Sequence, residues 1–555
     1  MASLRKIPLR FIFLNALLDC ALIKIFHLRP NIGSLSPFLV YVGIFQLLWI
    51  TQLVLFCLYA ICIYPFYVSP LRHLYSPKGG KPLIGFGREL RKNGPGPMAR
   101  EWFSETDSDA LMRVLLPGNQ EAIIIRSPQA ISDVLVKNSM KYEKPEFVRQ
   151  FLSHVIGWAL LTTEGDVHKK QRRNMNPAFS FRHIKDLYPL FWRKSQEVVN
   201  VMTEECRQNF YGKDYVCMDI SAWAVRSGLD IIGLAASGID FGAIQNAGSP
   251  LANTYYKLNP SSEDLLLILL WALVPDSIMM KLPLSRITSV SEASKHLKEV
   301  ATDLIRAKKI KMANKEDIGV DILSVALRAG LFSDDELVDQ ALTFLSAGHE
   351  TTASALTWAV YMLCRFPSTQ SRLREEIRAA IPSPENVDSS ISSADIDNLP
   401  YLNAVCDEVL RLYGPVPATV RVNNCDTTIQ GEFIPRDTMV IVPIWAINTD
   451  PLLWGPDAHD FKPERWLKPQ GDGAVPAQST SNYAFMTFLQ GPHKCIGNTF
   501  ARSEMACLLA AWVGRFAFEL DDPTLMDERN IVIPPSVIAK PDGGLQMKVR
   551  VVDGW

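Results

Sequence analysis

A ten-residue run near the C-terminal end of this 555-residue chain constrains its fold and chemistry more than any other feature. Residues 488–497 read Phe-Leu-Gln-Gly-Pro-His-Lys-Cys-Ile-Gly, which places Cys495 in a loop rich in Gly and Pro. Residues 498–516 are rich in apolar side chains and predict a helix that starts directly after this loop. Backbone N–H groups at the start of a helix stabilise a thiolate. The run therefore predicts a stabilised thiolate at Cys495.

A thiolate held in this way can bind a haem iron, and its electron donation favours cleavage of an O–O bond. A lone Cys-x-Gly is more typical of a structural cysteine, which is the alternative interpretation. The full ten-residue pattern is much more specific, and it resembles the haem-ligand loop of the cytochrome P-450 family of haem-thiolate monooxygenases. The resemblance implies that Cys495 is the axial ligand of a haem b iron. It also implies that Phe488, Gly491, His493 and Gly497 help to hold this cofactor.

A second motif of the same family begins at Glu408. The segment Glu-Val-Leu-Arg at residues 408–411 places Glu408 and Arg411 on one face of a helix, where they can pair. Taken alone, Glu-x-x-Arg is common and usually marks a solvated helix face. In the family, however, such a Glu and Arg join a second Arg in a buried ion network that supports the loop before the haem cysteine. By resemblance, the second Arg is Arg465 in Phe-Lys-Pro-Glu-Arg-Trp at residues 461–466.

Residues 333–366 predict one long helix. Ser333 and Glu336 form a capping-box pattern at its start, and the apolar pattern ends before Pro367. A Gly and two Thr in its middle, at residues 348–352, are a poor choice on helix propensity alone. A threonine hydroxyl can bond the carbonyl four residues back, which here belongs to Ala347, and so bend the helix and open space for a small ligand.

This mid-helix segment resembles the acid–alcohol pair of the P-450 family, which guides protons to the bound oxygen. The resemblance implies that Glu350 and Thr351 are the catalytic pair. A carboxylic acid and a hydroxyl in a buried place are suited to relay protons. The alternative interpretation is an exposed polar turn on a surface helix.

Four further residues match positions that bind the haem propionates in the family. The family often has Trp-x-x-x-Arg near the start of one helix, and this chain has His168 and Arg172 there. His493 likewise stands where an arginine is more usual, and Arg421 matches another propionate-binding arginine. For the basic cluster at residues 169–173 the alternative is a solvated face. A basic face can also dock an acidic electron donor, so both interpretations are compatible.

The N-terminal residues predict a membrane anchor. Residues 38–64 carry no charge and are numerous enough to span a bilayer, and Pro65 and Pro70 are expected to end this segment. Several Lys and Arg between residues 72 and 92 then place the rest of the chain in the cytosol by the positive-inside rule. An earlier apolar run, residues 11–26, contains Asp19 and Lys24 and is either the first arm of a hairpin or an interfacial helix. A cleavable signal peptide fits less well, because the longer second run would remain.

These features divide the chain into a membrane anchor at residues 1–70, a hinge at 71–87 and a haem-thiolate catalytic domain at 88–555. We expect the anchor to lie in the lipid of the endoplasmic reticulum membrane. Helical patterns dominate the large domain, with short strand-like runs at residues 122–125, 438–443 and 545–552. The fold class is therefore mainly α with a small β-sheet region, as the resemblance to the P-450 fold implies. Polar stretches at residues 381–398 and 468–482 predict surface loops.

Composition excludes several other classes of protein. The ten cysteines show no Cys-x-x-Cys spacing, so neither a zinc site nor a disulfide framework is predicted. A net charge of −1 with no basic stripe predicts no nucleic-acid partner. There is neither a complete Gly-x-Gly-x-x-Gly unit nor a phosphate loop. Electrons must therefore come from a separate protein, by resemblance the membrane-bound NADPH–cytochrome reductase.

By resemblance, the reaction inserts one atom of O2 into a hydrophobic small molecule. The chain looks most like fungal membrane-bound members of the family, many of which serve secondary-metabolite pathways. Segments that line the substrate pocket in the family are mainly apolar here, which favours a hydrophobic substrate. They correspond to residues 140–161, 249–271, 343–347, 416–419 and 537–539. The alternatives are a haem-thiolate isomerase or dehydratase, a fatty-acid or xenobiotic hydroxylase, and a non-catalytic membrane receptor.

Overall fold

The structure is a computed structural model, and it describes most of the chain. The described residues are 9–25, 37–93, 95–106, 108–209, 214–258, 267, 270, 274, 276–282, 284–384, 386, 390–467, 481–534 and 536–555. Most of the stretch 468–482 and part of the stretch 249–271, both considered above, lie outside them.

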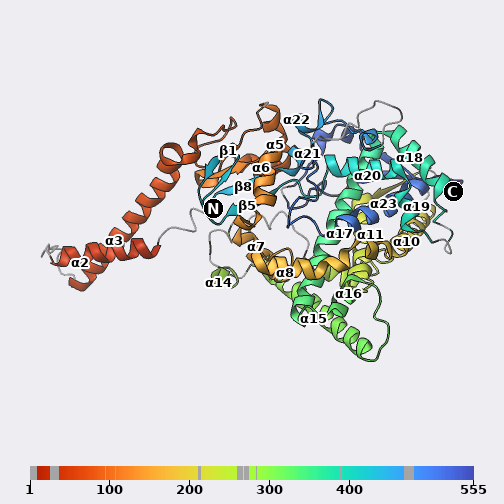
Figure 1. Ribbon diagram of the computed structural model, residues 1–555, viewed down its shortest axis with the longest axis horizontal. Helices are drawn as coiled ribbons and strands as arrows, with labels where there is room; N and C mark the ends of the chain where they lie inside the picture. Colours follow the sequence, from red (N-terminus) through yellow and green to blue (C-terminus); the bar gives the residue numbers. More distant parts are fainter. Residues whose placement is uncertain are drawn as a thin grey trace.

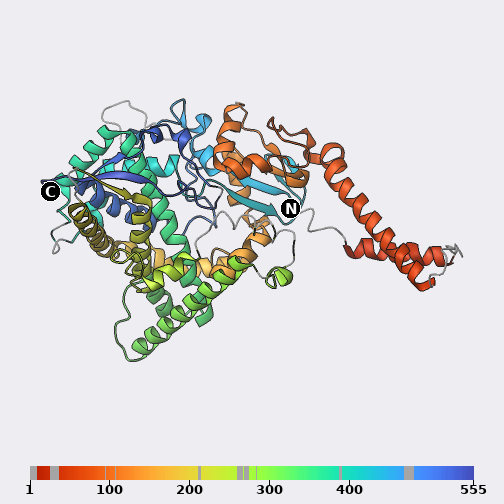
Figure 2. The same ribbon diagram turned by 180° about the vertical axis from the view of Figure 1, so that it is seen from behind.

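Two N-terminal helices project from a mainly helical body (Figures 1 and 2). They are α2 (Leu9–Ile25) and α3 (Pro37–Leu58), and α3 continues as a π-helix, η1 (Tyr59–Val68). The combined helix Phe38–Val68 is the only one in the described part of the chain that is long and apolar enough to cross a membrane. The expectation that Pro65 ends this helix is wrong. A proline removes one N–H donor and crowds the preceding turn, and the wider π-helix accommodates both effects.

The two N-terminal helices pack against each other. The rings of Phe13 and Phe45 meet edge to face with centroids 5.2 Å apart. Gln52 Nε2 donates a hydrogen bond to Asp19 Oδ2 over 2.7 Å. Asp19, the residue least suited to a membrane, therefore has its polar partner on the neighbouring helix, as a helical hairpin requires.

The end of the projecting helix is fixed to the body. Asn119 Nδ2 donates to the carbonyl of Ile61 over 2.9 Å, and Ser69 Oγ donates to Glu121 Oε2 over 2.8 Å. Residues 71–87, the expected hinge, also pack on the body, because Phe86 is buried and its N–H donates to the carbonyl of Leu115.

The body is mostly α-helical, with nineteen described α-helices of very different lengths. They are α4 (Gly87–Asn93), α5 (Pro95–Ser104), α6 (Pro128–Ser132), α7 (Glu146–Ile156), α8 (Gly165–Met175), α9 (Phe181–Lys185), α10 (Tyr188–Gln208), α11 (Ile220–Ile232), α12 (Pro250–Tyr256), α14 (Asp276–Met279), α15 (Ser285–Ala313), α16 (Ile322–Ala329), α17 (Asp334–Arg365), α18 (Pro367–Ala380), α19 (Ser393–Asp397), α20 (Pro400–Leu412), α21 (Ile444–Asn448), α22 (Pro451–Trp454) and α23 (Asn498–Arg515).

The described strands form three small sheets. They are β1 (Met112–Leu116), β2 (Gln120–Ile124), β3 (Tyr142–Glu143), β4 (Val216–Asp219), β5 (Thr419–Asn423), β6 (Thr427–Ile429), β7 (Glu432–Ile434), β8 (Met439–Val442), β9 (Phe516–Leu520) and β10 (Gln546–Val551). The largest sheet has the order β1-β2-β8-β5-β3 and is antiparallel except for the pair β2–β8. The others have the orders β4-β10-β9 and β6-β7. The three predicted strands correspond to β2, β8 and β10, and these predictions are confirmed.

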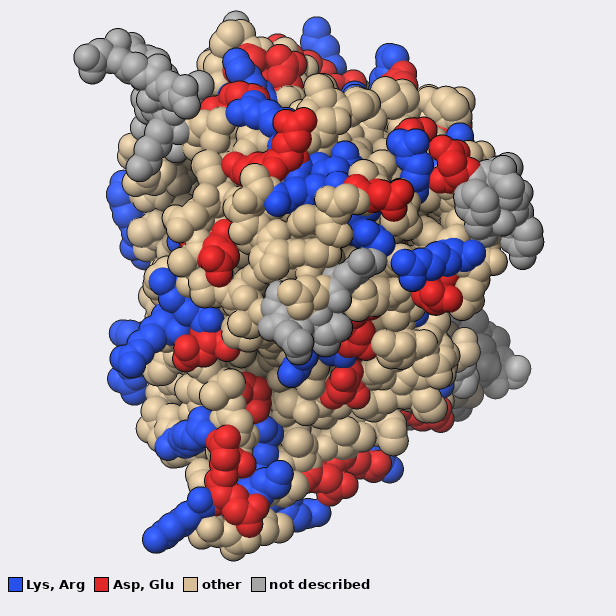
Figure 3. Space-filling model, turned by 90° about the vertical axis from the view of Figure 1, so that its right-hand side faces the viewer, with Lys and Arg blue, Asp and Glu red and all other residues tan. Residues whose placement is uncertain are grey.

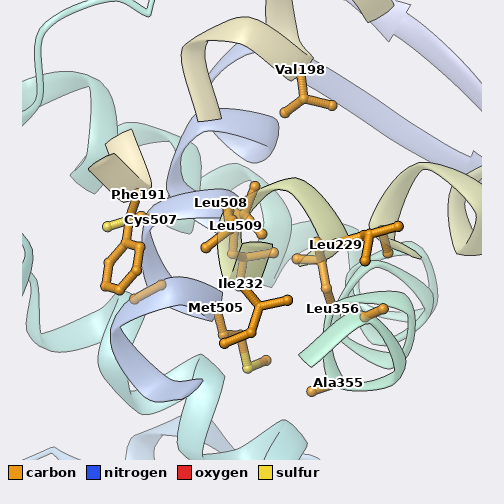
Figure 4. Close-up of a cluster of buried hydrophobic side chains, with 14 of the residues drawn as sticks. Phe191, Val198, Leu229, Ile232, Ala355, Leu356, Met505, Cys507, Leu508 and Leu509 are labelled. Atoms are coloured by element: carbon orange, nitrogen blue, oxygen red, sulfur yellow. The ribbon is translucent and has the colours of Figure 1, made fainter. Parts of the chain in front are cut away.

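The core of the body is a bundle of α10, α11, α17 and α23. Figure 4 shows their apolar side chains converging, among them Phe191 of α10, Ile232 of α11, Leu356 of α17 and Leu508 of α23. Burial of each large apolar side chain contributes about 1.5–3 kcal/mol. The crossing of α11 and α17 explains the glycine in the middle of α17. A Cβ at Gly348 would lie 2.6 Å from Ile232 Cγ1, so a larger residue would push the two helices apart.

The long predicted helix is confirmed as α17. Its Ser333–Glu336 capping box is present, with Ser333 Oγ accepting from the Glu336 N–H and the Glu336 carboxylate accepting from the Ser333 N–H. The stretch 381–398 is not entirely a surface loop, because it contains α19 with a buried Ile396. A second capping pattern, at Ser392 and Asp395, accounts for this short helix.

Candidate active site

The Cys495 loop is a tight turn that enters α23. The Cys495 N–H donates to the carbonyl of Phe488 over 2.8 Å, and the Lys494 N–H donates to that of Gly491 over 3.0 Å. Gly491 has a φ of 76°, and a Cβ there would lie 2.0 Å from the carbonyl oxygen of Leu135. Only glycine fits this place, since both the backbone conformation and the close approach exclude a side chain.

The sulfur of Cys495 has a backbone N–H donor at the start of α23, that of Gly497. Burial raises the pKa of the Cys495 thiol, while the Gly497 N–H and the charges of Arg172 and Lys494 act to lower it. The residue as a whole is nonetheless exposed to solvent. The predicted N–H donor is therefore present, but burial outweighs it. A haem iron held by this sulfur would be bound by the thiolate form.

Glu408, Arg411 and Arg465 lie together in one buried network. Arg411 Nη2 and Nε donate to the two carboxylate oxygens of Glu408 over 2.7 and 2.8 Å. Arg465 Nε donates to Glu408 Oε1 over 2.9 Å, and Trp466 Nε1 donates to Oε2 over 2.9 Å. The side chains of Glu408, Arg411 and Arg465 have no exposed surface. Buried charges of this kind are stable only when they are fully paired.

The network reaches the cysteine loop through an asparagine that the sequence did not single out. Arg411 Nη1 donates to the carbonyl of Asn448 over 2.9 Å. The Asn448 side chain then accepts from the Met486 N–H over 2.7 Å and donates to Thr487 Oγ1 over 2.8 Å. Thr487 directly precedes Phe488. The ion network therefore supports residues 486–487, which lead directly into the Cys495 loop.

The predicted acid–alcohol pair lies on the central helix α17. Thr351 Oγ1 donates to the carbonyl of Ala347 over 2.8 Å, which confirms the expected hydrogen bond. Only 3% of Glu350 is exposed, so the interpretation of this segment as an exposed polar turn is wrong. Lys540 Nζ lies 3.1 Å from Glu350 Oε2, and His349 Nε2 lies 3.6 Å from Oε1. Burial acts to raise the pKa of Glu350, but His349 and Lys540 lower it to about 2.

Comparison with known proteins decides the family of this chain. The sequence profile described as Cytochrome P450 matches residues 77–546. The chain belongs to the cytochrome P450 family. Its curated relatives include cytochrome P450 monooxygenase sphH of Aspergillus fumigatus, which is 41% identical over 90% of this chain and 91% of the relative. Monooxygenase buaD of Petromyces alliaceus is 38% identical over 91% and 92% of the two chains. Monooxygenase FUM15 of Gibberella moniliformis is 38% identical over 88% and 90%.

This protein is thus a cytochrome P450 monooxygenase. Membership of the family implies a haem–thiolate cofactor, dioxygen as oxidant and a reductase as partner. The long apolar helix Phe38–Val68 is suited to membrane anchoring, as in P450 enzymes of fungi.

The P450 has a cluster of polar side chains beside the Cys495 loop. His168 of α8 stacks on His493, with ring centroids 4.0 Å apart and an interplanar angle of 24°. His493 Nε2 lies 3.2 Å from Glu164 Oε2, and Lys144 Nζ donates to Glu164 Oε1 over 3.0 Å. The structure thus brings the two predicted histidines together. Sequence reasoning did not identify Lys144 and Glu164, whose side chains are mostly buried.

The two predicted arginines lie at the edges of this cluster. Arg172 Nη1 donates to the carbonyl of Lys494 over 2.6 Å, which ties α8 to the cysteine loop. Arg421 of β5 is buried, and Arg421 Nη1 donates to Thr419 Oγ1 over 3.0 Å. Burial lowers the pKa of Arg421, and the charge of Glu164 opposes this effect.

The charge balance of the cluster fits a dianionic cofactor. Burial acts to raise the pKa of Glu164, yet the hydrogen bond from His493 and the charge of Lys144 hold it well below its usual range. Burial lowers the pKa of His168 to about 3, so this ring is neutral. The positive charges of Lys144 and Arg421 act on Glu164, and Arg172 lies beside Cys495. Positive charge around this part of the loop suits the two propionates of a haem.

Proposed function

We propose that this P450 is a membrane-bound monooxygenase that hydroxylates or otherwise oxidises a hydrophobic small molecule. The observation that carries the proposal is the Glu350–Thr351 pair on α17, with Glu350 buried and ion-paired to Lys540. A monooxygenase consumes two protons for each O2 that it reduces, and a buried acid beside a hydroxyl can relay them. A haem-thiolate isomerase or dehydratase has no such requirement.

In this proposal, Cys495 binds the iron of haem b. His168, Arg172, His493 and Arg421 hold the propionates, and Phe488, Gly491 and Gly497 shape the turn around the ligand. The haem supplies the redox chemistry, in which substrate–H, O2, two electrons and two protons give substrate–OH and water. Glu408, Arg411 and Arg465 keep the Cys495 loop in place through Asn448.

The proposed electron donor is the membrane-bound NADPH–cytochrome reductase. Helix α8 has three exposed basic residues, Lys169, Lys170 and Arg173, and Lys494 of the cysteine loop is exposed as well. Arg172 joins these two segments by its hydrogen bond to the Lys494 carbonyl. A basic surface beside the cofactor ligand attracts an acidic donor and brings it close to the haem.

The proposed location is the endoplasmic reticulum membrane, with the catalytic domain in the cytosol. Residues 1–70 form the anchor, residues 71–87 the connection, and residues 88–555 the catalytic domain. The packed α2–α3 pair supports a helical hairpin as the anchor. Figure 3 shows the end of the molecule that lies far from these helices, where Lys and Arg side chains are mixed with Asp and Glu. Such a surface belongs in water.

The proposed substrate is apolar and belongs to the secondary metabolism of a fungus. The relatives are fungal monooxygenases at 38–41% identity over most of their length. Two large apolar side chains in the turn after α7 support an apolar ligand, because Trp158 and Leu161 are exposed at 50% and 38%. Exposed apolar groups of this size often mark a binding surface.

The first test is the absorption spectrum of membranes that contain the chain, reduced with dithionite and treated with carbon monoxide. We expect a strongly red-shifted Soret band, which disappears in Cys495→Ala. Folded, haem-containing protein without this band would mean that Cys495 does not bind the iron. Addition of reductase, NADPH and an extract of the producing fungus under ¹⁸O2 then identifies the substrate as the compound that gains one labelled oxygen atom.

A further inference from the structure

Glu350 has a partner that lies 190 residues further along the chain. Lys540 Nζ donates to Glu350 Oε2 over 3.1 Å. The two side chains differ in their exposure: 4% of the Glu350 side chain and 37% of the Lys540 side chain reach solvent. Lys540 is therefore a partner of this buried carboxylate that itself reaches solvent.

The backbone beside Lys540 is fixed to the same face of α17 that carries Glu350. The carbonyl of Ala539 accepts from Ser354 Oγ over 2.7 Å and from Trp358 Nε1 over 2.9 Å. Glu350, Ser354 and Trp358 are four residues apart, so they form one row along the helix. The hydrogen bonds from Ser354 and Trp358 fix residues 539–540 against this row. Glu350 lies one helical turn before Ser354, within reach of the Lys540 side chain.

On its inner side, Glu350 faces a histidine that is held from another helix. His349 is fully buried, and its Nδ1 lies 3.1 Å from the hydroxyl of Tyr255 on α12 and 3.2 Å from the carbonyl of Leu345. Its Nε2 is 3.6 Å from Glu350, which is too far for a hydrogen bond. The ammonium of Lys540 is thus the closer of these two partners of Glu350.

We propose that Lys540 is a positioning residue for proton supply, which holds the Glu350 carboxylate in place and connects it to water. This inference rests on the proposed function, because it assigns Glu350 to the relay. In each transfer the ionised Glu350 carboxylate accepts a proton from water beside Lys540 and releases it toward Thr351, so the charge of the Glu350–Lys540 pair is the same before and after. The Lys540 ammonium keeps donors free for that water, since it has three N–H groups.

The test compares Lys540→Met, which removes the charge, with Lys540→Arg, which keeps it. NADPH oxidation is measured with reductase and dioxygen alone, in H2O and in D2O, so no substrate has to be known. A positioned acid contributes about 10²–10⁴-fold to a rate. We expect Lys540→Met to slow oxidation by about tenfold and to raise the solvent isotope effect, and Lys540→Arg to restore both. Lys548→Met is the matched control, because the Lys548 ammonium lies over the Tyr215 ring.

A second measurement does not depend on turnover. Thermal unfolding of the haem-containing protein is compared for Glu350→Gln, Lys540→Met and the double variant. We expect the double variant to be no less stable than Glu350→Gln alone, because the two changes remove one interaction. The carbon monoxide spectrum shows whether each variant is folded and contains haem.

Two results would overturn the proposal. They are a Lys540→Met enzyme with the wild-type rate and isotope effect, and additive losses of stability in the double variant. If the wild type itself shows neither the Soret band nor reductase-driven oxidation, the proposed function fails, and the catalytic role of Lys540 fails with it. The unfolding experiment then still reports separately whether the Glu350–Lys540 pair exists.

Discussion

Three glutamates in the core of this P450 have very different surroundings. Glu408 accepts hydrogen bonds from Arg411, Arg465 and Trp466 and from the Lys462 N–H, and it has no exposed surface. Glu350 pairs with the Lys540 ammonium at 3.1 Å, and 37% of the Lys540 side chain is exposed. Glu504 of α23 is fully buried, and neither of its oxygens has a hydrogen-bond partner among the described residues.

The difference between these glutamates indicates what each one does. A carboxylate with every lone pair occupied is fixed and cannot exchange protons without breaking the structure around it. A carboxylate that pairs with a partly exposed ammonium can exchange protons with water. Glu504 represents a third case. Burial raises its pKa well above the usual range, with only Thr352 acting against this, so Glu504 is a neutral acid.

The largest effect is expected from Arg411→Ala, which leaves Glu408 buried with half of its charged partners. Removal of one partner from a buried ion network costs about 3–5 kcal/mol. Since the network supports the chain before Phe488, we expect the purified variant to contain no haem. Haem content is measured as the pyridine haemochrome, and the free energy of unfolding is measured by denaturant titration.

The matched control for this variant is Arg372→Ala. Arg372 also pairs with a glutamate, Glu464, over 2.7 Å, but about half of each side chain is exposed. Exposed pairs contribute about 0–1 kcal/mol. Normal haem content in Arg411→Ala would show that the Glu408 network does not support the cysteine loop.

The second largest effect is expected from Glu350→Gln, and it falls on the rate rather than on haem binding. The change leaves Lys540 without its carboxylate, but Lys540 already has over a third of its side chain in water and can be solvated. We expect normal haem content, with NADPH oxidation slower by about 100-fold. Loss of haem in this variant would show that Glu350, like Glu408, has a structural role. The two glutamates would then not differ in function.

The elements of the site follow from local sequence patterns. Capping residues, apolar periodicity and the proline after it defined α17 in advance, because these signals act over one or two turns of helix. The Gly and Pro content of residues 488–497 likewise defined the Cys495 turn. The extension of α3 through Pro65 and the short helix α19 were not predicted. The first depends on a change to π-helix around a proline, and the second on a capping box in a stretch with little apolar pattern.

The partners within the site do not follow from local patterns. Glu164 meets His493 only because the loop before α8 and the cysteine loop are brought together by the fold, and Lys144, which precedes α7, pairs with Glu164 in turn. Lys540 is separated from Glu350 by 190 residues. Asn448, which links the ion network to Thr487, has no motif of its own. Such contacts depend on the register of whole helices and sheets, which short motifs do not encode.

The smallest effect is expected from Glu504→Gln. A neutral carboxylic acid and an amide have nearly the same size, and neither brings a charge into the core. We therefore expect the free energy of unfolding to change by less than about 1 kcal/mol, as for other volume-conserving core substitutions. Haem content and NADPH oxidation are expected to stay at wild-type levels.

The same substitution at Glu408 is the matched control, because Glu408→Gln removes a negative charge that Arg411 and Arg465 both need. Denaturant titration of the two variants side by side measures the difference directly. A loss in Glu504→Gln as large as that in Glu408→Gln would show that Glu504 is ionised in the folded protein. An ionised Glu504 would need a hydrogen-bond donor, which the described residues of α17 and α23 do not provide. The roles assigned above to the three glutamates from their partners would then be wrong.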